Sequence, residues 1–180
     1  MVDVRPHHPE HGPEKGNGDP AGRGGARLNI LVTDGGWRDE SWAECLPRLL
    51  EPMGVHACRA GSGREATTVL RATRIHAAIV DLTLPLTDEG AERHHRMQAQ
   101  PHTEEGGARL LELLARVEAP PPIVVVREPR FSRDDARDLF AALKHGVFAV
   151  VDRPVNIELM LEVFRRLLAR HYRGQWPGLS

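Results

Sequence analysis

The chain has 180 residues, of which 41% are hydrophobic, and this suffices for one domain with additional segments. Its formal net charge of -1 gives no overall field that would attract nucleic acid or an anionic membrane. No apolar run approaches the length of a transmembrane helix, and the N-terminal residues lack the apolar centre of a signal peptide. We therefore expect a cytoplasmic protein that binds neither nucleic acid nor membrane.

Short apolar runs alternate with amphipathic stretches from Leu28 onward. The predicted strands are residues 28–33, 55–60, 76–81, 121–126 and 147–152. The first predicted helix follows the first strand and extends to about Met53, with an interruption at Pro47. The other predicted helices cover 62–73, 106–119, 132–146 and 156–172. Ser62 and Ser132 are candidate N-caps, and Gly146 suits the residue after a helix end. Five successive βα units predict a single α/β domain with a doubly wound parallel sheet and helices on both faces.

The segments outside this pattern are polar. Residues 1–27 are rich in Pro, Gly and His and predict a disordered tail, and 173–180 form a short C-terminal tail. An inserted loop is expected at about 87–105, within a domain spanning 28–172. These polar segments contain six histidines that could bind a metal or a phosphate, although histidines in such segments are more commonly plain solvent-exposed surface residues. They are His7, His8, His11, His94, His95 and His102. Cys45 and Cys58 have no metal or redox spacing, which favours buried thiols.

Four charged residues stand at the ends of predicted strands. Asp34 follows the first strand, Asp81 ends the third, Arg127 follows the fourth and Arg153 follows the fifth. In open α/β sheets the ligand crevice lies just beyond the carboxyl ends of the strands. A lone Asp81 would usually start a turn or cap a helix, but four such residues predict a common site at one edge of the sheet.

This ordered set resembles the receiver domain of bacterial response regulators. The segments that carry the resemblance are "ILVTDGG", "VDLTLP", "GGARLLELLARV", "IVVVREP" and "HGVFAVVDRPVNIELMLEVFRRLL". The resemblance covers about residues 28–172 and implies a flavodoxin-like (βα)5 fold with strand order 2-1-3-4-5. It also implies a cis peptide bond between Arg153 and Pro154. Asp81 falls at the phosphoacceptor position, and Asp34 and Asp81 fall at positions of the Mg²⁺-binding acids.

The same resemblance implies a phosphoryl switch, in which a histidine kinase is the phosphate donor and Mg²⁺ assists the transfer. This sequence departs from that pattern at three positions. Gly35 stands where the family has a second acid, Arg127 replaces a Thr or Ser, and Arg153 replaces a Lys. Two acids and two arginines give this site no net charge, whereas the family's three acids and one Lys attract a divalent cation. We therefore expect weak or absent Mg²⁺ binding and no other cofactor.

A guanidinium can clamp a carboxylate bidentately, so Arg127 or Arg153 is predicted to pair with Asp81 in place of the metal. The less specific interpretation is that Arg127 points to solvent and the site is a remnant. On the first hypothesis the chain is an atypical receiver, not an enzyme, that acts by protein–protein docking in two-component signal transduction. The expected partner is a histidine kinase or a downstream effector, and a homodimer through the fourth and fifth helices is a further candidate.

Two alternatives remain open from the residues. The first is a phosphorylation-competent phosphorelay carrier that uses Asp81. The second is a small enzyme or nucleotide binder on a flavodoxin-like scaffold, since fold does not fix function. Against the second, "TDGGW" lacks both a dinucleotide fingerprint and a P-loop. The segment "RGQWPGLS" after the last helix is too short for a DNA-binding output domain, and its Trp176 is a candidate interface residue.

Overall fold

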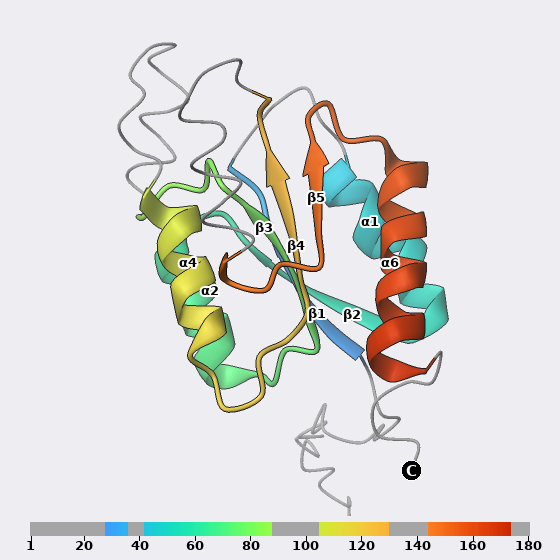
Figure 1. The fold of residues 1–180 in the computed structure, drawn as a ribbon, viewed down its shortest axis with the longest axis horizontal. Coiled ribbons are helices and arrows are strands. Elements are labelled where there is room, and N and C mark those ends of the chain that lie inside the picture. Colours follow the sequence, from blue (N-terminus) through green and yellow to red (C-terminus); the bar gives the residue numbers. More distant parts are fainter. Residues whose placement is uncertain (1–27, 36–41, 88–104, 130–143, 174–180) are drawn as a thin grey trace, which may run out of the picture.

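A computed structural model of the chain describes residues 28–35, 42–87, 105–129 and 144–173. The sheet has five parallel strands: β1 (Leu28–Thr33), β2 (Val55–Ala60), β3 (Ala77–Asp81), β4 (Ile123–Arg127) and β5 (Ala149–Asp152). Their order is β2-β1-β3-β4-β5 (Figure 1), which confirms the predicted topology. The central strand β3 is buried along its whole length, as expected for a parallel strand covered on both faces.

Helices cover both faces of the sheet. The described helices are α1 (Trp42–Leu50), the 3-10 turn η1 (Glu51–Met53), α2 (Gly63–Ala72), α4 (Glu105–Ala115) and α6 (Ile157–Tyr172). Figure 1 shows α1 and α6 on one face and α2 and α4 on the other. Alternate strand residues divide between two cores, so that Ile30 and Ile79 pack toward α1 and α6 whereas Leu31 and Val80 pack toward α2 and α4.

The helix boundaries follow from local chemistry. The Ser62 hydroxyl accepts a 3.1 Å hydrogen bond from the Glu65 N–H and caps α2, as predicted. Asn156 caps α6 in the same way, through a 2.9 Å bond from the Leu159 N–H. Pro47 lies inside α1 rather than breaking it. Gly146 has a φ of 71°, the left-handed conformation predicted for the residue after a helix end.

The two cysteines are half-buried, whereas the sequence pattern favoured buried thiols. Cys58 lies on β2, an edge strand that pairs with β1 on one side in the described sheet. Its partial burial raises the pKa of the Cys58 thiol above the usual value. Cys45 lies on α1, beside rather than within the buried stripe formed by Trp42, Leu46 and Leu50.

Several predictions fall outside the described residues. These concern the tail 1–27, residues 174–180 of the C-terminal tail 173–180, most of the insertion at 87–105, and most of the predicted helix 132–146 with its Ser132 cap. The histidines of the tail and the insertion (His7, His8, His11, His94, His95 and His102) and Trp176 lie there too. In the described ranges, no helix combines the length and the apolar character needed to cross a membrane.

Candidate functional site

The four charged residues singled out from the sequence lie at the carboxyl edge of the parallel sheet. Asp81 ends β3 and pairs in register with Val126, while Arg127 ends β4 and pairs with Asp152. Asp34 follows β1, and its N–H donates to the carbonyl of Ala60 at the end of β2. Arg153 follows β5, and its N–H donates to the Arg127 carbonyl at 2.9 Å. Parallel strands bring these ends to one edge, as predicted.

The Asp81 carboxylate lies at the centre of this edge and is fully buried. Its Oδ2 accepts hydrogen bonds from the Gly35 N–H and from the Arg153 guanidinium, each at 2.8 Å. Its Oδ1 accepts from the Thr83 N–H at 2.9 Å and from the Thr83 hydroxyl at 2.8 Å. Both oxygens therefore have hydrogen-bond donors from the protein itself, which is what a buried charge requires.

Arg153 supplies the positive charge that faces Asp81. Its Nη2 lies 2.8 Å from Asp81 Oδ2, and the two side chains are 5% and 0% exposed. The Arg153–Pro154 peptide bond is cis, as the resemblance implied. The ion pair joins the loop between β5 and α6 to the end of the central strand β3. Charge-assisted hydrogen bonds of this kind are about twice as strong as neutral ones.

Arg127 was an equal candidate for pairing with Asp81, but it contacts a different acid. Its Nε donates to Asp152 Oδ1 at 2.7 Å, with side chains 14% and 53% exposed. The register explains this difference. Asp81 is paired with Val126, so Arg127, one residue further along β4, projects from the opposite face of the strand. Its own register partner is Asp152, which it meets directly.

Gly35 permits the close approach of the loop after β1 to Asp81. A Cβ atom at position 35 would lie 2.8 Å from Asp81 Oδ2 and 2.8 Å from Thr83 Oγ1, closer than real Cβ atoms come. The family's second acid would therefore collide with the carboxylate in this arrangement. The absence of a side chain at Gly35 therefore makes room for its own N–H to bind Asp81.

Two threonines that sequence reasoning missed complete the site. The buried Thr33 hydroxyl donates to the Ile79 carbonyl at 3.1 Å and accepts from the Asp81 N–H at 2.9 Å, so it joins β1 to β3. Thr83 folds back onto Asp81 two residues earlier, as residues following an aspartate at a turn often do. A polar residue in the apolar run "LNILVT" and the spacing of "DLT" were the signals that could have found them.

The start of α4 fixes the segment that follows Asp81. A Cβ atom at Gly107 would overlap the Asp81 carbonyl and the Leu82 backbone. On the neighbouring helix α2, the Gly63 N–H donates to the Pro85 carbonyl at 2.8 Å and the Arg64 N–H donates to the Leu86 carbonyl at 3.1 Å. Residues 82–86 are therefore held between the first turns of two helices, and this holds Asp81 in position.

The residues present do not fit a Mg²⁺ ion. Mg²⁺ requires near-octahedral oxygen ligands, usually including carboxylates. The described part of the chain contains no group of three or more His, Cys, Asp or Glu side chains that could hold a metal ion. Asp81 Oδ2 already accepts hydrogen bonds from the Gly35 N–H and from the Arg153 guanidinium, and the positive charge of the guanidinium would repel the cation. This arrangement therefore does not favour a metal ion at Asp81 Oδ2.

This fold and the buried acid at the end of its third strand define the class: the domain has the CheY-like fold of response-regulator receivers. No family model matches the chain. A curated response regulator receiver protein of Anaeromyxobacter sp. (strain Fw109-5) is 28% identical over 137 residues, which cover 76% of this chain and 47% of that protein. The chain thus spans about half the length of that relative.

Solved structures show the same fold. A response regulator receiver domain protein (CheY-like) from Methanospirillum hungatei superposes with a TM-score of 0.59 at 19% identity, covering 83% of this chain and 99% of that one. A response regulator receiver protein from Pseudomonas putida gives a TM-score of 0.55 at 24% identity, covering 79% and 98%.

Proposed function

We propose that this chain is an atypical receiver that acts in two-component signal transduction by docking onto other signalling proteins. In this proposal Asp81 is held by Arg153 and is not a phosphoryl acceptor. The observation that carries it is the buried ion pair, with Arg153 Nη2 2.8 Å from Asp81 Oδ2 and both side chains at most 5% exposed. Protein docking, rather than an enzymatic reaction, is then what the domain contributes.

The accessibility of the carboxylate supports this proposal. A nucleophilic carboxylate must present an oxygen lone pair to the incoming phosphorus atom and must lie in line with the leaving group. Asp81 is 0% exposed, and its two oxygens accept four hydrogen bonds from Gly35, Thr83 and Arg153. To accept a phosphoryl group, the Asp81 carboxylate would have to separate from the Arg153 guanidinium. That separation is costly, because it leaves an uncompensated buried charge.

The second candidate function is a phosphorelay carrier that uses Asp81. One observation favours it: the Arg153 guanidinium lies at the acceptor carboxylate, where a cation could hold the oxygens of a transferred phosphoryl group. The match covers 47% of the receiver protein from Anaeromyxobacter, and the partner of this domain would be a histidine kinase or an effector under either proposal.

Incubation with acetyl phosphate and Mg²⁺, followed by intact-mass spectrometry, separates the two candidates. We expect no phosphoryl adduct on the unmodified chain under conditions that fully modify an ordinary receiver. The double variant Gly35→Asp/Arg153→Lys restores the family's second acid and its Lys. It should gain an adduct, because the added carboxylate supplies a Mg²⁺ ligand and the flexible Lys replaces the guanidinium that faces Asp81. Asp81→Asn in that double-variant background is the matched control and should lose the adduct. An adduct on unmodified Asp81 would establish the phosphorelay carrier instead.

A further inference from the structure

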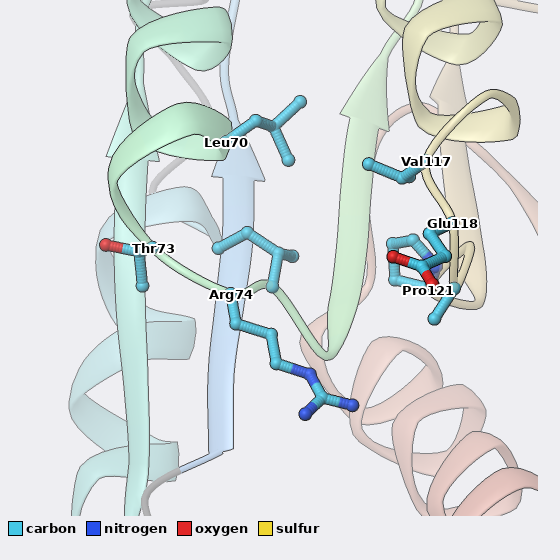
Figure 2. A pocket seen from close by; sticks show the side chains of 8 residues that line it. Leu70, Thr73, Arg74, Val117, Glu118 and Pro121 are labelled. Atoms are coloured by element: carbon cyan, nitrogen blue, oxygen red, sulfur yellow. The ribbon is translucent and has the colours of Figure 1, made fainter.

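A groove lies at the edge of the sheet opposite to Asp81. It is formed by the C-terminal end of α2 and the loop that follows α4, and its cavity volume is about 560 Å³. Leu70 and Val117 extend toward each other from these two walls (Figure 2), and two further lining residues, Ile75 and Pro121, are buried. The buried lining residues are therefore apolar, and the groove is separate from the site at the carboxyl ends of the strands.

Charged residues stand at the rim of this groove, one on each wall. Arg74 follows α2 and Glu118 follows α4, and both side chains are exposed. No ion pair joins them to each other, or to any other residue that the structure describes. Large apolar side chains are exposed beside them, since Val117 is 41% and Leu113 is 36% exposed. An apolar centre with a charged rim is the anatomy of a protein–protein interface.

A small-molecule site would have polar groups inside the groove rather than only at its rim. Such sites orient their ligand with a few polar groups set inside an apolar pocket. Here the buried lining residues, Ile75 and Pro121, are apolar, and the charged ones lie on the exposed rim. The groove is thus better suited to a partner that covers it than to a ligand that enters it.

We infer that this partner is a second copy of the chain. An interface with two-fold symmetry must be self-complementary, because the same patch meets itself after rotation. A positive residue on one wall and a negative residue on the other satisfy that requirement. Rotation about an axis through the groove brings Arg74 of each copy to Glu118 of the other, with Leu70 and Val117 at the centre. The inference is independent of the proposal for Asp81.

Sedimentation equilibrium of the full chain over a range of concentrations tests this dimer. The unmodified chain should dimerise, and Arg74→Glu and Glu118→Arg should each weaken the dimer about tenfold or more, because each places like charges together. The double variant Arg74→Glu/Glu118→Arg should regain most of the affinity, since the reciprocal pairs are restored with reversed sign. Val117→Asp should also weaken the dimer without unfolding the chain, because Val117 is exposed.

Leu159→Glu is the control for a different face. Leu159 is 52% exposed on α6, away from the groove, so this change should leave the dimer intact. Dissociation by Leu159→Glu but not by the two charge reversals would place the interface on α6 and overturn the inference. A chain that stays monomeric at every concentration, or a double variant without recovery, would overturn it as well.

Discussion

Arg153 and Asp81 are 72 residues apart in the sequence, and their side chains meet at 2.8 Å in the interior of the domain. This pair connects the loop between β5 and α6 to the central strand, and neither partner has access to solvent beyond 5%. A buried pair of this kind is not in itself evidence of stability, since an apolar pair can do as well, but breaking it by removing one partner is costly.

Asp81→Asn should destabilise the domain. The change keeps the shape of the side chain but leaves the Arg153 guanidinium buried without its anion, which costs about 3–5 kcal/mol in comparable pairs. Urea unfolding followed by circular dichroism would measure the loss. Asp152→Asn is the matched control, because it removes the Arg127 ion pair at a side chain that is 53% exposed. Its cost should stay below about 1 kcal/mol. Equal costs for the two variants would contradict a special role for the buried pair.

The two residues of the buried pair should also be energetically coupled. Arg153→Met alone leaves a buried carboxylate that retains donors only from Gly35 and Thr83 among the bonds described above. The double variant Asp81→Asn/Arg153→Met removes both charges, and so it should lose less free energy of unfolding than the two single variants summed. Coupling energies for contacting residues are about 0.5–3 kcal/mol. Additive losses within error would show that the two side chains act independently.

Gly35→Ala should destabilise the domain by about 1–3 kcal/mol, as overpacking does in a filled interior. The added methyl group would lie 2.8 Å from both Asp81 Oδ2 and Thr83 Oγ1, so the loop has to move away from its hydrogen bond. Gly61→Ala provides the comparison, because the nearest atom to its Cβ is Glu65 Oε2 at 3.7 Å. Thermal unfolding of both variants would test this, and a neutral Gly35→Ala would mean that the loop is not fixed against Asp81.

The stability of the domain should fall as the pH drops below about 6.5. The Nδ1 atom of His76 accepts a 3.0 Å bond from the Asn29 N–H, and it can do so only while it carries no proton. Burial, followed by the nearby Arg74 charge, lowers the pKa of His76 below its usual value of 6.5. Its pKa is therefore lower in the folded chain than in the unfolded chain, so the unfolded state binds the proton first and protonation favours unfolding. The contribution is complete above pH 6.5 and is lost as the pH falls through the folded pKa.

His76→Asn tests the source of this dependence. The Asn side-chain oxygen can accept the same bond but does not titrate, so the fall in melting temperature between pH 7.5 and about pH 5.5 should become smaller. A part of the fall should persist, since burial also lowers the pKa of His171 on α6. His171→Asn should remove that second part. An unchanged pH dependence in His76→Asn would assign the effect to other groups.

Among the residues that the structure describes, the sequence by itself was sufficient for the order and type of the elements. Apolar runs such as "AAIVD" can be satisfied only between two layers of helices, and the Ser62 cap is a local hydrogen bond within one turn. The resemblance to receivers supplied the strand order and the cis peptide bond at Pro154, both of which the structure bears out. Even the convergence of Asp34, Asp81, Arg127 and Arg153 follows from strand direction, because parallel strands end at one edge.

Only the tertiary structure decided which of two arginines faces Asp81. That choice depends on the register of β4 against β3 and β5, which pairs Asp81 with Val126 and Arg127 with Asp152. Register is a long-range property, since a shift by one residue would turn Arg127 to the other face of its strand. The crowding around Gly35 and the groove beside Arg74 are of the same kind, because both arise where segments distant in the chain pack together, and local sequence patterns carry no record of such distances.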